Sequence, residues 1–79
     1  MAVYTYDDEA DAFYVLLVEE PQAAIERTVE LGPRLHVDID AQGAVVGVEV
    51  LYPRTYGVDL GPVEERYGLR IEIPFRFAA

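Results

Sequence analysis

The stretch from residue 38 to residue 49, DIDAQGAVVGVE, carries acidic side chains and a glycine at several of the places that a calcium-binding loop requires. Asp38, Asp40 and Glu49 take the first, third and twelfth places, and Gly43 takes the sixth. Such a loop lies between two helices, whereas the flanks here alternate apolar and polar side chains with the period of a strand. We therefore predict a β-hairpin, in which Gly43 has a positive φ and Asp40 accepts backbone N–H groups at the turn.

The same hairpin offers a second arrangement of metal ligands. His36, Asp38 and Asp40 project from one face of the expected strand, and Glu49 lies across the hairpin within reach of Asp38 or Asp40. One imidazole with several carboxylates suits a divalent ion. Charged side chains along a strand more often face solvent, and the sequence offers His36 no partner that would orient it as a ligand. We prefer the solvated face, and a metal-binding protein or metal-dependent enzyme using these four residues is the alternative.

Two further sets of polar side chains have structural explanations. The segment DDEAD at residues 7–11 carries four carboxylates, but acid–base chemistry would require burial that separates their pKa values. We predict a turn there, in which Asp7 or Asp11 accepts hydrogen bonds from the local backbone. The six tyrosines lack interleaved basic residues near the N-terminal end, so we expect them in a core or subunit contact and not in a nucleic-acid stacking surface.

Composition narrows the chemistry of this 79-residue chain. It contains no Cys, Ser, Lys, Asn or Trp, which removes disulfides, thiolate zinc sites, serine or cysteine nucleophiles and lysine Schiff bases. We predict no catalytic residues and no cofactor. The chain is 52% hydrophobic with a mean hydropathy of +0.09, which is high for a short soluble protein. Part of its apolar surface is therefore expected to be covered by a second copy in a homodimer.

The net charge of −9 is unevenly distributed. Residues 1–53 carry eleven acidic side chains against two arginines, whereas residues 54–79 carry four of each sign. Such a field repels nucleic acid and attracts a basic protein partner, and it also keeps a small apolar protein soluble. No signal-peptide pattern is present, and the longest apolar run, residues 12–18, is far shorter than the roughly 20 residues of a membrane span. We expect a cytoplasmic protein without membrane contact.

Hydrophobic periodicity predicts a mostly β, α+β-leaning single domain with a small antiparallel sheet of five or six strands. The expected strands are residues 3–6, 12–18, 24–31, 34–40, 44–51 and 69–77. Residues 12–18 are apolar on both alternating faces, as in an interior strand that is covered on both sides. Pro62 and Gly68 bracket one short helix near residues 62–67, and Pro74 places the last strand at an edge or ends its pairing.

Two of these stretches together resemble a known family. YDDEADAFYV at residues 6–15 is similar to the Tyr-Asp-Pro-Glu-Ala-Asp-Ala-Leu-Tyr-Ile opening of the short bacterial proteins known as domain of unknown function 2283. VDIDAQGAVVGVEVL at residues 37–51 is similar to the Val-Asp-Asp-Gly-Arg-Val-Val-Gly-Ile-Glu-Ile-Leu hairpin of that family, and ERTVE at residues 26–30 fits the strand between them. Asp8 departs from the pattern by replacing the usual proline.

The resemblance covers residues 4–51 and leaves residues 52–79, with their loop, helix and C-terminal strand, unmatched. Tyr52-Pro53-Arg54 replaces the Asp-Ala-Ser ending of the family. The resemblance implies a small β-rich domain and supplies no catalytic residue. Members are often suspected of being encoded beside small toxin-like proteins, which implies an antitoxin-like neutraliser of a basic toxin.

The family positions that this chain retains have structural explanations: Glu9, Asp11 and Gly43 suit turns, Gly47 suits a close approach of strands, and Glu49 suits an outward charge. We expect a non-catalytic protein-interaction module that forms a homodimer through the second face of residues 12–18 or through the C-terminal strand. The charged rim for a basic protein partner is expected to consist of Glu19, Glu20, Glu26, Glu30, Asp38, Asp40 and Glu49.

Overall fold

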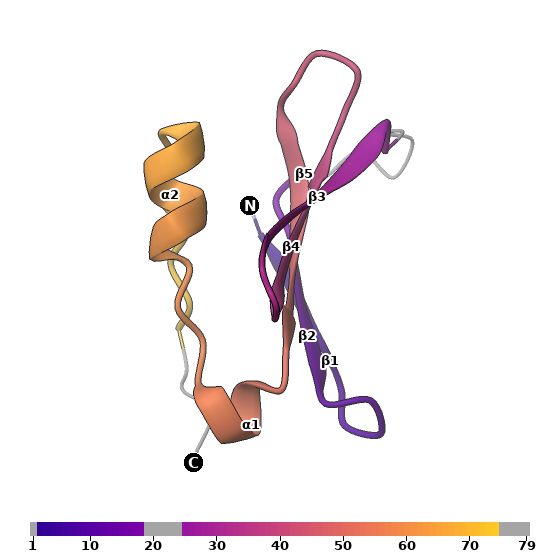
Figure 1. Ribbon diagram of the computed structural model, residues 1–79, viewed down its shortest axis with the longest axis vertical. Coiled ribbons are helices and arrows are strands. Elements are labelled where there is room, and N and C mark those ends of the chain that lie inside the picture. Colours follow the sequence, from indigo (N-terminus) through magenta and orange to yellow (C-terminus); the bar gives the residue numbers. More distant parts are fainter. Residues whose placement is uncertain (1, 19–24, 75–79) are drawn as a thin grey trace.

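The computed structural model describes residues 2–18 and 25–74 and contains one five-stranded antiparallel sheet with two short helices (Figure 1). The elements are β1 (Val3–Asp7), β2 (Ala12–Leu16), β3 (Arg27–Gly32), β4 (Leu35–Ile39), β5 (Val45–Leu51), α1 (Pro53–Tyr56) and α2 (Gly61–Tyr67). This arrangement confirms the predicted mostly β fold class. In the part of the chain that is described, no helix has the length and apolar character that crossing a bilayer requires.

The strand order β1-β2-β5-β4-β3 joins a two-stranded hairpin to a three-stranded meander through the pairing of β2 with β5. The predicted hairpin is confirmed, since β4 pairs antiparallel with β5. At its turn, Asp40 Oδ1 accepts hydrogen bonds from the backbone N–H groups of Gln42 and Ala44, both at 2.9 Å. Gly43 has a φ of +86°, a conformation that glycine adopts without strain. The residues that resemble a calcium loop therefore form the tight turn of a hairpin and the adjoining parts of its two strands.

The turn between β1 and β2 is also the one that the acidic segment predicts. Asp7 Oδ1 accepts hydrogen bonds from the backbone N–H groups of Glu9 at 3.1 Å and Ala10 at 3.2 Å. Asp11 has a φ of +50°, and its Oδ1 accepts a hydrogen bond from the Tyr6 hydroxyl at 2.7 Å. These bonds give Asp7 and Asp11 a local structural role.

The core lies between one face of the sheet and the segment that follows β5. Side chains from the inner strands have no exposed surface, as in Phe13, Val15 and Val48. Leu60 and Val63 cover them from α2 and the residue before it, and both belong to the same hydrophobic cluster. Figure 1 shows α2 lying along this face of the sheet and α1 at its lower end. We call this the covered face.

The predicted helix near residues 62–67 is confirmed as α2, and Gly68 ends it in the left-handed conformation with a φ of +65°. A second helix, α1, was not expected, because Pro53 and Gly57 resembled loop residues. Pro53 begins a single helical turn, where its missing N–H costs nothing, and the N–H of Gly57 closes that turn on the carbonyl of Pro53 at 2.8 Å.

The prediction of a sixth strand at residues 69–77 is wrong for residues 69–74, which join no β-ladder, and residues 75–77 lie outside the described residues. Leu69, Ile71 and Ile73 do pack against the core, as their alternation indicates. The backbone of this segment is bound by side chains instead of by a strand. The N–H of Ile71 donates to the Glu64 carboxylate at 2.7 Å, and the carbonyl of Glu72 accepts a hydrogen bond from the Tyr4 hydroxyl.

The cover that a second copy was expected to give to the other face of residues 12–18 stays a prediction. The described residues place helices on one side of the sheet only (Figure 1). Ala12, Tyr14 and Leu16, which alternate with the buried residues of β2, remain partly exposed. We call this second side of the sheet the open face. Its apolar residues on β2 explain why the strand resembles one that is buried on both sides.

Candidate functional site

The open face is formed by the strand residues that alternate with the core residues, since side chains along a strand point to opposite sides. The pairing of the strands assigns to it Val3, Thr5 and Asp7 of β1; Ala12, Tyr14 and Leu16 of β2; Gly47, Glu49 and Leu51 of β5; His36 and Asp38 of β4; and Thr28 and Glu30 of β3. Apolar side chains gather on the β1–β2 side of this face, and polar and acidic ones on the β4–β3 side.

A hydrogen-bonded row crosses four strands of the open face. The Tyr14 hydroxyl of β2 donates to Asp38 Oδ2 of β4 at 2.7 Å, although β5 lies between these strands. Thr28 Oγ1 of β3, the register partner of Asp38, donates to the other carboxylate oxygen at 2.6 Å. Both oxygens of Asp38 are thus held by neutral hydroxyl donors, which fixes the position of a negative charge near the centre of the face.

Gly47 makes this row possible because it is the β5 residue opposite Asp38. A Cβ atom built on Gly47 would lie 2.1 Å from the Tyr14 hydroxyl oxygen and 2.4 Å from the ring carbon that bears it. Any side chain at Gly47 would therefore displace the phenol. A close approach at Gly47 was expected from the sequence, and the neighbour that approaches is a tyrosine side chain.

Burial raises the pKa of Tyr14 above its ordinary value of 10.0, and its hydrogen bond to Asp38 and the negative charges of Asp38 and Glu49 raise it further. The phenol therefore stays protonated in neutral solution. It serves as a fixed hydrogen-bond donor, and it is unsuited to accept a proton as a general base.

A second row contains Glu30, His36 and Glu49, which follow one another on β3, β4 and β5. The Nδ1 atom of His36 lies 3.5 Å from Oε1 of Glu49, and the Glu49 side chain is 43% exposed. This contact is an ion pair only when the imidazole is protonated, and Nδ1 has no hydrogen-bond partner among the described residues. The expectation that Glu49 lies near Asp38 or Asp40 is corrected, because the register places it opposite His36.

The four residues of the possible metal site are thus distributed among different contacts. Asp38 is held by Tyr14 and Thr28, and Asp40 Oδ1 is bound to the turn backbone. Within residues 2–18 and 25–74, no three His, Asp or Glu side chains come together closely enough to hold a metal ion.

The other residues expected to form a charged rim are only partly on the open face. Glu30 lies on it and is exposed, whereas Glu26 is exposed just before β3 at the edge of the sheet. Glu19 and Glu20 lie outside the described residues. Of the expected rim, the structure brings Glu30, Asp38 and Glu49 together on neighbouring strands.

Tyr14 and Thr28 were missed as members of this site. Tyr14 was expected to contribute packing alone, and Thr28 had no distinguishing neighbour in the sequence. The signal that could have identified them is Gly47, since a glycine within a run of valines marks a point that a side chain from another strand crosses.

The part of the chain that forms the sheet matches a known protein family. Residues 4–52 match the family described as "Protein of unknown function (DUF2283)". The match runs from β1 to the end of β5 and stops before α1, so the helical segment lies outside the matched region. No curated protein and no solved structure matches the chain.

Proposed function

This chain belongs to the DUF2283 family, whose function is unknown, and we propose that it is a non-catalytic interaction module that holds a basic protein partner on its open face. The observation that carries the proposal is the uniform sign of that face. Glu30, Asp38 and Glu49 occupy adjacent strands, and no strand position of the open face within the described residues holds an arginine.

Arg27 of β3 is the register partner of the core residue Ile39, and Arg34 and Arg54 contact aromatic rings on the covered side. The Arg34 guanidinium stacks over the ring of Tyr56 at 4.0 Å, and that of Arg54 over the ring of Tyr6 at 5.3 Å. Acidic side chains such as Asp59 and Glu64 also lie on the covered side, but among the described residues arginines are found only there, so the strand positions of the open face present a negative field outward. Such a field steers a positively charged partner toward this side and disfavours partners of like charge.

The apolar part of the open face adds contact area beside the charges. Val3 is 48% exposed, and Leu16 and Leu51 are partly exposed. Protein interfaces combine an apolar centre with a polar rim and bury about 800 Å² on each partner. An antitoxin-like neutraliser of a small basic toxin would use the apolar residues for contact and the acidic row for orientation.

The proposal is tested by capture of proteins from the native cytoplasm with the wild-type chain and with the Glu30→Gln, Glu49→Gln double variant. We expect one stoichiometric basic protein at low salt, lost at high salt and lost with the double variant, because screening and neutralisation both remove the attraction. Glu65→Gln is the matched control, since Glu65 is an exposed acid of α2. Capture that salt and the double variant leave unchanged would contradict the proposal.

Two other results would assign the open face differently. A dimer of the purified chain by light scattering, dissociated by Leu16→Glu, would give the apolar part of the face to a second copy; the expected homodimer stays a prediction until then. Stoichiometric divalent metal in the purified protein, lost with His36→Ala, would favour the metal-binding alternative instead.

A further inference from the structure

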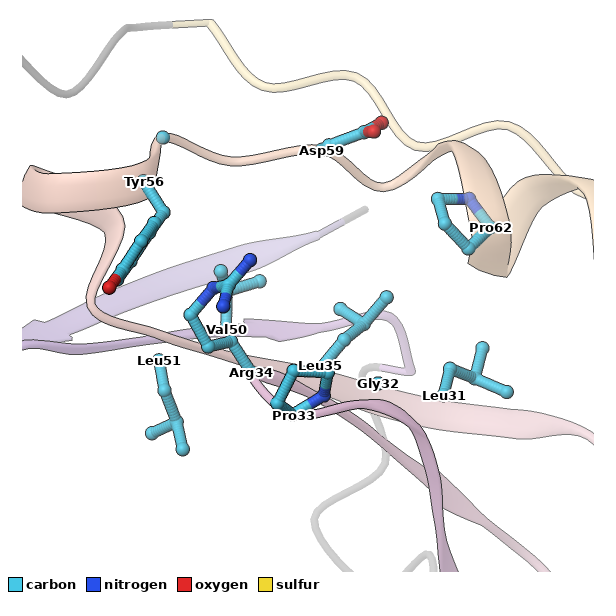
Figure 2. Close-up of a pocket in the computed structure, with 11 residues that line it drawn as sticks. Leu31, Gly32, Pro33, Arg34, Leu35, Val50, Leu51, Tyr56, Asp59 and Pro62 are labelled. Carbon is cyan, nitrogen blue, oxygen red and sulfur yellow. The ribbon is translucent and has the colours of Figure 1, made fainter.

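A small pocket lies on the covered side, between the turn from β3 to β4 and the connection from α1 to α2 (Figure 2). Its volume is about 200 Å³. Leu31, Leu35 and Val50 provide apolar walls, and Arg34 and Asp59 are the only charged side chains among the described residues that line it. Pockets for drug-sized molecules have volumes of roughly 300–1,000 Å³, so a ligand of this pocket is smaller than that.

Arg34 presents a guanidinium that is held in place but not neutralised. Its Cζ atom lies 4.0 Å from the centre of the Tyr56 ring, and a guanidinium held by such a cation–π contact can still offer N–H groups to a planar carboxylate. Within residues 2–18 and 25–74, no carboxylate forms an ion pair with Arg34. Figure 2 shows its side chain extending from the turn toward the connection that carries Asp59.

Asp59 supplies the opposite charge at the rim of the pocket. Its Oδ1 accepts a hydrogen bond from the backbone N–H of Gly61 at 3.0 Å, which fixes the carboxylate at the start of α2. A purely anionic ligand would be attracted by Arg34 and repelled by Asp59. A dipolar ligand with one charge of each sign is complementary to both.

We propose that this pocket binds a small aliphatic α-amino acid. The ligand carboxylate pairs with the guanidinium of Arg34, its ammonium group pairs with Asp59, and its side chain contacts Leu31, Leu35 and Val50. Tyr56 and Asp59 lie outside residues 4–52, so the site is assembled from the matched sheet and from the segment that follows it. The proposal is independent of the open face.

The test titrates the wild-type chain with L-leucine at millimolar concentrations and follows amide chemical shifts. We expect shifts at the pocket residues, and at least roughly tenfold weaker binding of leucinamide, N-acetyl-leucine and glycine, which lack the carboxylate, the ammonium group and the side chain respectively. These ligands probe the folded wild type, so the outcome does not depend on the folding of any variant. Absence of shifts with leucine overturns the proposal, and so does equal binding of any of the three analogues.

Variants then assign the contacts. Arg34→Met and Asp59→Asn are each expected to weaken leucine binding roughly tenfold, and Asp59→Asn keeps the oxygen that accepts from Gly61. Arg66→Met is the matched control, because Arg66 also lies over a tyrosine, Tyr67 at 5.8 Å, but does not line the pocket. Binding that falls equally in all three variants overturns the assignment. The Glu30→Gln, Glu49→Gln double variant is expected to bind leucine as the wild type does, which separates this proposal from that of the open face.

Discussion

The covered and open faces of the sheet use side chains from the same five strands, yet they are ordered by different forces. On the covered face, Phe13 and Val48 have no exposed surface and are held by apolar packing against the helical segment. On the open face, Tyr14 and Asp38 are held by directed hydrogen bonds. A close-packed core loses stability when a side chain is made smaller. A hydrogen-bonded row can be exposed to water, but its bonds depend on the distances and angles between the donor and acceptor atoms. The difference explains why the first face supports the fold and the second can present fixed charges to a partner.

The largest difference between the faces is expected from truncation in the core. Phe13→Ala leaves a cavity at a fully buried position, and we expect it to lower the free energy of unfolding by about 3–5 kcal/mol. Thr5→Ala, at an exposed position of the open face, is expected to change it by less than about 0.5 kcal/mol. Urea denaturation measures both values. Similar losses in the two variants would mean that the covered face is not the core.

The next largest effect is expected at Gly47, over which the Tyr14 side chain passes to reach Asp38. Gly47→Ala forces the Tyr14 phenol out of its position, and we expect a loss of roughly 1–3 kcal/mol in the free energy of unfolding. In a Tyr14→Ala background the added methyl group meets no ring, so the same substitution is expected to cost less. Chemical denaturation of the four proteins measures this coupling. An identical cost in both backgrounds would show that the phenol does not lie over Gly47.

A smaller effect is expected from the hydrogen bond itself. The double-mutant cycle of Tyr14→Phe and Asp38→Ala should give a coupling of about 1 kcal/mol, because a partly buried hydroxyl donates to a charged acceptor. The cycle of Thr28→Val and Asp38→Ala should give less, since the bond from Thr28 is exposed to water. A Thr28 coupling that exceeds the Tyr14 coupling would reverse this order.

The smallest expected effect appears only in alkaline solution. The pKa of Tyr14 is raised in the folded protein, so the neutral phenol stabilises the fold below pH 10, and that contribution is lost as the pH rises above 10, where an unfolded chain ionises its tyrosines. Unfolding free energies at pH 8 and above pH 10 should therefore differ less for Tyr14→Phe than for the wild type.

Tyr6 allows the same comparison on the covered side. Burial and its hydrogen bond to Asp11 also raise the pKa of Tyr6, by less than for Tyr14. Tyr6→Phe should therefore remove less of the alkaline loss of stability than Tyr14→Phe does. A larger effect of Tyr6→Phe would indicate that the hydroxyl of Tyr14 is more accessible to water than the structure places it.

The hairpin around Gly43 and the end of α2 at Gly68 were predictable because each depends on a few neighbouring residues and one backbone angle. The C-terminal segment was predictable only in part. Its alternation gave the correct core-facing side chains, Leu69 and Ile71, but a period of two does not specify which groups the backbone binds. Here Glu64 and Tyr4 take the place of a neighbouring strand.

The amino-acid sequence by itself determined the five strands, the turns at residues 7–11 and 40–44 and the negative charge of the first two thirds of the chain, because these are local or additive properties. Only the tertiary structure decided that Tyr14 reaches Asp38, 24 residues away, across Gly47, and that Arg34 meets Tyr56 beside a pocket. Those contacts depend on the strand order and on where the helical segment packs. Both are set by long-range burial, which no short window of sequence encodes.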